Sequence, residues 1–83
     1  MQNVIIRQTF NSEAYNQFDI IDAKTNQKIA YYIEHNMHPI DNTILENTVY
    51  EIYYDYDEND EEYTGSAVTE SKSEMFEYIG ISI

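Results

Sequence analysis

The sequence contains no cysteine, a single proline, two glycines and only four basic residues among its 83 residues. The absence of cysteine excludes disulfides, thiolate nucleophiles and zinc sites built on thiolates. Two glycines are too few for a glycine-rich loop that cradles phosphate. No run approaches the ~20 apolar residues of a membrane-spanning helix, and the N-terminal segment lacks the parts of a secretory signal. We therefore expect one domain over residues 1–83, in the cytoplasm, without a membrane or a cofactor.

The charge is strongly one-sided. Sixteen acidic residues face four lysines and arginines, which gives a formal net charge of −12. Such a chain repels nucleic acid, anionic membranes and acidic proteins, and it is steered toward basic surfaces. The 42% of hydrophobic residues is enough for a folded core, so we do not interpret the chain as disordered.

Alternating apolar residues predict an antiparallel sheet. We expect strands over residues 3–10, 18–22, 29–34, 48–57 and 63–69. Strands followed by one helical segment indicate an α+β fold, with a small antiparallel sheet of about four to five strands and one C-terminal helix packed on it. In the first strand, Val4, Ile6 and Phe10 are expected on one face and Arg7 on the other.

The connections are predicted from polar residues and the proline. Residues 11–16 read as a turn or a single helical turn. Asn26 is the residue expected to take a positive φ in the hairpin between the second and third strands. Residues 34–42 contain Pro39 and are expected to form a loop.

The C-terminal segment has the signals of a short helix. Ser71 and Glu74 fit a capping box, and Gly80 is placed to end the helix in a left-handed conformation. The core residues expected from this helix are Met75, Phe76 and Ile79. Ile81 and Ile83 would pack on the sheet, extend it, or leave an apolar patch for a weak homodimer.

Residues 48–57 give the clearest strand, and its two faces differ. The face expected to be apolar and aromatic carries Tyr50, Ile52, Tyr54 and Tyr56. The other face carries Glu51, Tyr53, Asp55 and Asp57. Acids continue through residues 58–62, which we place at a hairpin tip. In the neighbouring strand Tyr31 and Tyr32 are adjacent, so one of them must face away from the core.

The acids are concentrated in one half of the chain. Between Glu46 and Glu77 there are eleven acidic residues and one basic residue, Lys72. An acidic hairpin tip is often a solvated loop that discourages strand pairing between molecules. Here the acids also extend along a strand, and like charges at this density oppose folding, so a function for them is worth proposing.

A calcium loop is one alternative. Asp55, Asp57 and Asn59 stand at alternate positions, like the first oxygen ligands of an EF-hand loop. The glycine of that motif is Asp60 here, and its final glutamate is Ser66. The match is partial, and it predicts weak cation binding at most.

Nucleic-acid mimicry is another interpretation. Carboxylates on alternate strand residues lie ~7 Å apart, more sparsely than the charges of duplex DNA at one per ~1.7 Å. The tip acids bring the density nearer. Tyr53, Tyr56 and Tyr63 lie among them, and tyrosine is enriched where proteins grip proteins.

In size, acidity and lack of cysteine and catalytic motifs, with the acids gathered from Glu46 to Glu77, the chain resembles the small phage and mobile-element inhibitors that mimic DNA. That class includes anti-CRISPR proteins, anti-restriction proteins and uracil-DNA glycosylase inhibitors. The resemblance implies binding to the DNA site of a host nuclease, glycosylase or surveillance complex. It covers about two-fifths of the chain and transfers no individual residue.

Enzyme and metal chemistry find little support in the sequence. His35 and His38 could ligate a metal with Glu34 or Asp41, but Pro39 opposes a continuing helix there, and both histidines fit the surface equally well. No Gly-x-Ser-x-Gly elbow is present. We expect a protein that is not an enzyme and has no metal site.

These observations predict a non-enzymatic inhibitor that binds a basic DNA- or RNA-binding host protein or nucleoprotein complex in the host cytoplasm, without binding nucleic acid itself. Two alternatives stay open: an acidic immunity or antitoxin protein that blocks a basic toxin, and a soluble phage accessory protein whose acidity has no function. A monomer or weak homodimer is expected. The predicted contact residues are Glu51, Tyr53, Asp55, Tyr56, Asp57, Glu58, Asp60, Glu61, Glu62 and Tyr63.

Overall fold

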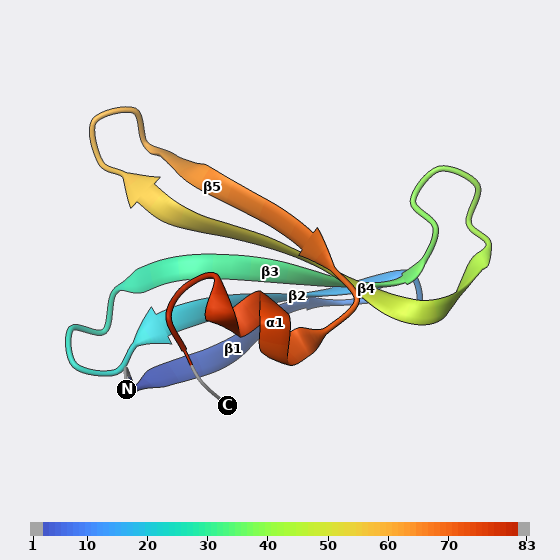
Figure 1. Cartoon of the computed structure of the whole chain (residues 1–83), viewed down its shortest axis with the longest axis horizontal. Helices are drawn as coiled ribbons and strands as arrows, with labels where there is room; N and C mark the ends of the chain where they lie inside the picture. Colours follow the sequence, from blue (N-terminus) through green and yellow to red (C-terminus); the bar gives the residue numbers. More distant parts are fainter. Residues whose placement is uncertain (1–2, 82–83) are drawn as a thin grey trace.

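The computed structural model describes residues 3–81 as an antiparallel sheet followed by a short helix (Figure 1). The elements are β1 (Val4–Asn11), β2 (Tyr15–Asp22), β3 (Lys28–Met37), β4 (Ile44–Asp57), β5 (Glu62–Thr69) and α1 (Lys72–Glu77). Each strand pairs with the next, so the order in the sheet is β1-β2-β3-β4-β5. This confirms a small α+β fold with an antiparallel sheet and a C-terminal helix, although the helix is only six residues long. Ile83 lies outside the described residues.

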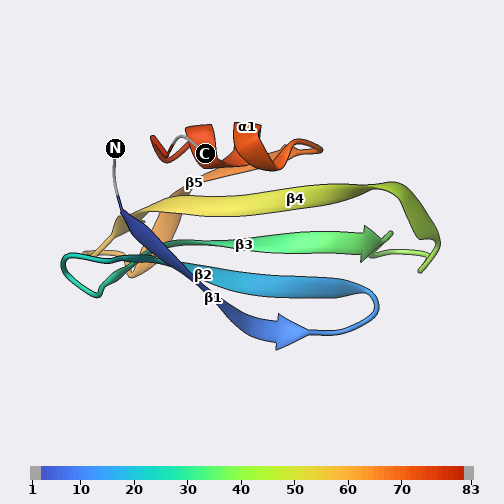
Figure 2. The same cartoon turned by 90° about the horizontal axis from the view of Figure 1, so that it is seen from below.

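The core lies between α1 and one face of the sheet. Figure 2 shows the helix on one side of the strands, and we call the opposite side the open face. The buried cluster consists of Ile20, Ala30, Tyr32, Ile52, Met75, Phe76 and Ile81. Tyr32 is 1% exposed, whereas Tyr31 stacks on Tyr53 with ring centroids 4.9 Å apart. The prediction that one of these two adjacent tyrosines faces away from the core is confirmed, and Tyr31 is that residue.

The helix begins and ends at the expected residues. The Ser71 hydroxyl accepts a hydrogen bond from the Glu74 amide at 3.2 Å. The Glu74 carboxylate accepts from the Thr69 hydroxyl, so the reciprocal half of the predicted capping box is missing. Gly80 has φ 75°, and the Ile81 amide donates to the Phe76 carbonyl at 3.0 Å, which closes a Schellman motif.

The predicted orientation of Phe10 is wrong. The register between β1 and β2 shifts between Gln8 and Phe10, a β-bulge that places one extra residue in β1. Phe10 is therefore opposite Gln17 and stacks on Tyr15, with ring centroids 4.9 Å apart. Beyond the bulge, the simple alternation of faces no longer holds.

The loop predicted over residues 34–42 is also partly wrong. β3 continues to Met37, and the next loop covers residues 38–43. The extension is paired on both sides, because His35 is opposite Tyr15 of β2 and Val49 of β4. Residues 12–14 form a turn without a helix, and Asn26 has φ 59° as predicted.

Candidate functional site

The last part of the β4–β5 hairpin extends beyond the rest of the sheet. β3 pairs with β4 no further than Tyr53, whereas β4 and β5 remain paired to Asp57 and Glu62. Residues 54–65 therefore form a two-stranded projection, which we call the acidic ribbon. Figure 1 shows its tip rising away from the other strands, at the sheet edge opposite β1. A projection of this kind can enter a concave surface on another molecule.

The backbone of the acidic ribbon departs from regular strand geometry. Asp55 has φ 56° and Glu61 has φ 55°, both in the left-handed region. The Thr64 hydroxyl donates to the Asp55 carbonyl at 2.9 Å, and the Asn59 amide donates to the Asp57 carboxylate at 2.9 Å. The conformation of Asp55 interrupts the alternation predicted for β4, so Tyr56 does not join Tyr50 and the core.

Six carboxylates of the acidic ribbon have no basic partner among residues 3–81. They belong to Asp55, Asp57, Glu58, Asp60, Glu61 and Glu62. Among residues 3–81, Arg7 and Lys28 form ion pairs with Asp19, while His35 lies close to Glu51 and His38 close to Asp41. Five of the six residues are exposed and Asp57 is half-buried. The negative charge at this end of the molecule is therefore open to solvent or to a partner.

Four tyrosines gather at the base of the acidic ribbon, and we call them the tyrosine cluster: Tyr31, Tyr53, Tyr56 and Tyr63. The Tyr31 ring stacks on Tyr53 and meets Tyr63 edge-on at 5.2 Å between centroids. Tyr56 lies 5.0 Å from Tyr63 and is 46% exposed. The Lys28 ammonium lies 4.8 Å from the centre of the Tyr31 ring, so the cluster already holds one cation against an aromatic face.

A hollow of about 340 Å³ lies beside the tyrosine cluster. It is lined by Gln27, Lys28, Ile29, Tyr54, Asp55, Tyr56, Glu58 and Ile79. The β2–β3 turn, the start of β3, the start of the acidic ribbon and the segment after α1 each contribute to its wall. It combines apolar and aromatic surface with two carboxylates that form no ion pair among residues 3–81. This chemistry suits the aliphatic stem and charged head of an arginine or lysine side chain.

Glu51 is separate from the other predicted acids. It lies on the open face, where His35 Nε2 is 3.0 Å from its Oε1 atom and the Tyr53 hydroxyl donates to its Oε2 atom. The hydrogen bond from Tyr53, and after it that from His35, lowers the pKa of the Glu51 carboxyl. The same bond raises the pKa of Tyr53 to about 12. Glu51 thus has partners within the fold and is less available to a ligand than the six acids of the ribbon.

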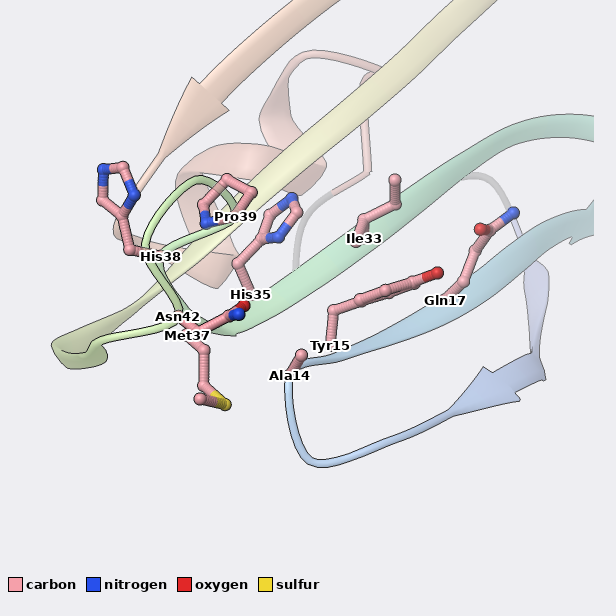
Figure 3. A pocket seen from close by; sticks show the side chains of 9 residues that line it. All are labelled: Ala14, Tyr15, Gln17, Ile33, His35, Met37, His38, Pro39 and Asn42. Atoms are coloured by element: carbon pink, nitrogen blue, oxygen red, sulfur yellow. The ribbon is translucent and has the colours of Figure 1, made fainter.

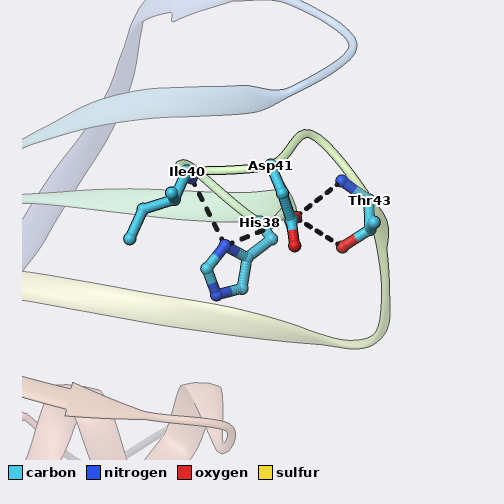
Figure 4. A network of polar contacts seen from close by, with 4 residues as sticks. All are labelled: His38, Ile40, Asp41 and Thr43. Atoms are coloured by element: carbon cyan, nitrogen blue, oxygen red, sulfur yellow. Dashed lines mark hydrogen bonds and ion pairs between the residues drawn. The ribbon is translucent and has the colours of Figure 1, made fainter.

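The two histidines lie at the other end of the open face. His35, His38 and Tyr15 line a hollow of about 270 Å³ beneath the β3–β4 loop (Figure 3). The loop is held by its own contacts, since the Ile40 amide donates to His38 Nδ1 at 3.3 Å and the Thr43 hydroxyl donates to Asp41 at 2.8 Å (Figure 4). Hydrogen bonds from the side chain and from the backbone amide of Thr43 lower the pKa of the Asp41 carboxyl. Within residues 3–81, no group of three or more histidine and acidic side chains could hold a metal ion.

The structure brings together nine of the ten predicted contact residues around the ribbon and its base, whereas Glu51 touches this group only through its hydrogen bond from Tyr53. Sequence reasoning missed Lys28, Ile29 and Ile79, which join the site from β3 and from beyond α1. It also missed Tyr31 as a member of the cluster. Tyr31 joins the cluster because the β3–β4 register places it directly opposite Tyr53. Knowledge of that register would have been needed to predict it.

Comparisons of the chain with protein-family models, curated proteins and solved structures gave no match. In the part of the chain that the structure describes, no helix is long and apolar enough to cross a membrane. The interpretation of the site therefore depends on its geometry and its charge.

Proposed function

We propose that this chain is a non-enzymatic inhibitor that binds the basic, DNA-binding surface of a host defence or DNA-processing protein, in the cytoplasm of the host cell. The observation that carries the proposal is the acidic ribbon, in which six carboxylates that have no basic partner in the described part of the chain project from the sheet beside four tyrosines. The ribbon acids stand in for phosphates, and the tyrosines supply packing area.

The negative charge of the ribbon requires a positively charged surface on the partner. A surface that binds DNA carries lysines and arginines positioned for phosphates. Carboxylates on the two strands and the turn of the ribbon present negative charge on several sides of a narrow projection, as a nucleic-acid strand does. Opposite charges also speed the encounter, and salt weakens this attraction.

The tyrosines and the hollow beside them add a more specific contact. An arginine of the partner enters the hollow, stacks its guanidinium on the exposed Tyr56 ring and meets Asp55 and Glu58. The contact between Lys28 and Tyr31 supports this proposal, since a cation already lies on one ring of the same cluster. Burial of Tyr56 would give the interface an aromatic anchor of the kind that dominates binding energy.

The test compares two variants with equal net charge. The first carries Asp55→Asn, Asp57→Asn, Asp60→Asn and Glu61→Gln in the ribbon. The control carries Glu13→Gln, Glu46→Gln, Glu70→Gln and Glu77→Gln, four exposed acids outside it. We expect wild type and control to retain on immobilised basic DNA-binding proteins of bacterial defence and repair, to elute as salt rises, and to be displaced by duplex DNA.

The ribbon variant should lose retention by at least ~10-fold, while its circular dichroism spectrum stays that of a folded sheet. Equal losses in the two variants would mean that total charge, and not the ribbon, governs binding. A protein that bound this chain and duplex DNA together, each at full affinity, would contradict occupation of the DNA site.

A further inference from the structure

The first strand has features of a pairing surface. β1 is an outer strand of the sheet, and its second edge has no strand beside it among residues 3–81. Ile5 is 48% exposed and Ile6 is 40% exposed, on opposite faces of the strand. An outer strand with apolar side chains on both faces is a template for a strand from another molecule.

The direction of the backbone groups in β1 follows from its hydrogen bonds. The Ala23 amide donates to the Asn3 carbonyl at 3.1 Å, next to the pair formed by Val4 and Asp22. Hydrogen-bonded pairs alternate with non-hydrogen-bonded pairs in an antiparallel ladder. Ile5 therefore bonds to β2, and residues 4, 6 and 8 direct their amides and carbonyls outward.

We propose that β1 pairs with β1 of a second copy of this chain, antiparallel and about a two-fold axis at Ile6. In this register Ile6 forms a hydrogen-bonded pair with its own symmetry mate, and Val4 pairs with Gln8 of the second copy. All three of these residues direct their backbone groups outward. In this register their amides and carbonyls therefore form hydrogen bonds with the second copy. The bulge after Gln8 ends the pairing, because it disturbs the ladder.

The charge distribution selects a second copy as the occupant. Each chain carries a net charge of −12, so two copies can approach closely only where acids are absent. Residues 3–12 contain no acid, and Arg7 is their one basic residue. The acidic ribbon belongs to the opposite edge of the sheet, four strand spacings or about 19 Å away. Pairing through β1 therefore keeps the two ribbons at the far ends of a continuous sheet.

The side chains across the axis are also compatible. On the helix side of the sheet, the two Ile6 side chains meet and cover each other. On the open face, Ile5 stands opposite Arg7 of the second copy. Within each chain, the Arg7 guanidinium lies 3.6 Å from the Asp19 carboxylate. An isologous interface of this kind closes on itself as a dimer and leaves both ribbons free.

Sedimentation equilibrium of the full chain tests the association. We expect a dimer whose dissociation constant falls as salt is added, because salt screens the repulsion between the two copies. This direction is opposite to that expected for binding to a basic partner, so failure of one proposal can be told from failure of the other. Ile6→Glu should weaken the dimer by ~100-fold or more, since it buries two like charges at the axis.

Val68→Glu is the matched control, because Val68 is 66% exposed on the other outer strand, β5. It should leave the dimer intact. A chain that is monomeric at the highest soluble concentration, or a dimer lost in Val68→Glu but not in Ile6→Glu, would overturn the proposal.

Cross-linking tests the register even if Ile6→Glu fails to fold. The chain has no native cysteine, and residues 5 and 7 of the two copies form a non-hydrogen-bonded pair with Cα atoms ~4.5 Å apart, within the range of a disulfide. A mixture of Ile5→Cys and Arg7→Cys chains should form disulfide-linked dimers at least ~10-fold faster than either chain alone. Equal rates in all three samples would exclude this register.

Discussion

The ring of Tyr54 fills the space that a side chain at residue 65 would occupy. Gly65 is the cross-strand partner of Tyr54, and a Cβ atom built on it would lie 2.7 Å from the Tyr54 Cδ2 atom. The glycine lets the ring lie flat against β5, where it packs against the core and forms one wall of the hollow beside the tyrosine cluster. The base of the ribbon thus depends on this pair.

Replacement of this glycine should be costly. Gly65→Ala is expected to lower the free energy of unfolding by ~1–3 kcal/mol, because the added methyl group displaces the Tyr54 ring. Urea denaturation measures the loss. Ser66→Ala, at the exposed neighbouring position, should change stability by less than ~0.5 kcal/mol. Equal stability of the two variants would show that the ring moves without cost.

The left-handed backbone of Asp55 gives a second prediction. Asp55→Ala should destabilise the fold by ~1 kcal/mol, since a Cβ-bearing residue without a short polar side chain is strained at φ 56°. Asp55→Asn and Asp55→Gly should be close to wild type. Asp60→Ala is the control, because Asp60 has no positive φ. If Asp55→Ala equals Asp60→Ala in urea denaturation, residue 55 is not held in this conformation in solution.

The hydrogen bond between Tyr53 and Glu51 should make stability depend on pH. The folded-state pKa of Glu51 is lowered, so the bond adds stability above the unfolded-state pKa, and that stability is lost as the pH falls through the folded-state value. Tyr53→Phe should therefore lower the free energy of unfolding by ~1 kcal/mol at pH 7 and by much less at about pH 3. A loss that is the same at both pH values would contradict this origin.

At alkaline pH, the stability contributed by the same hydrogen bond should fall as the pH rises. The pKa of Tyr53 is raised to about 12, so its contribution is complete below the unfolded-state pKa of about 10 and is lost as the pH rises toward the folded-state value. Burial also raises the pKa of Tyr32 to about 12, so absorbance titration of the tyrosines should show two late phenols, and the Tyr53 phenol should disappear in Tyr53→Phe. In Glu51→Gln that phenol should titrate earlier, because its charged partner is gone.

Salt should stabilise this protein. The six acids of the ribbon repel one another, and counterions screen that repulsion. The melting temperature should rise by a few degrees between low and moderate ionic strength, and it should rise less in the Asp55, Asp57, Asp60 and Glu61 variant described above. The charge-matched control variant should retain more of the salt dependence. A melting temperature that falls with salt would show that attractive pairs dominate.

Local sequence signals predicted the parts of the fold that depend on one or two residues. Asn26 and Gly80 adopt the positive φ values expected of them, and Ser71 begins the helix because its hydroxyl bonds to a free amide. Tyr50, Ile52 and Tyr54 pack on the core as their alternation predicts. At each of these positions the residue itself supplies the physical cause.

Features that arise from pairing between strands could not be predicted in this way. The bulge before Phe10 depends on how β1 meets β2, and the extension of β3 past Glu34 depends on partners in β2 and β4. Asp55 has no local signal for a left-handed conformation stronger than that of other aspartates. Lys28 and Ile79 join the hollow because three separate segments converge there, and no sequence spacing records that convergence.

The strictly sequential strand order has a kinetic consequence. Every strand pairs with its neighbours in the chain, so no pairing has to wait for distant segments to find each other. The sheet can grow hairpin by hairpin from either end, and the C-terminal helix then packs on it to close the core. We expect the main refolding phase to be rapid, which stopped-flow tyrosine fluorescence would measure.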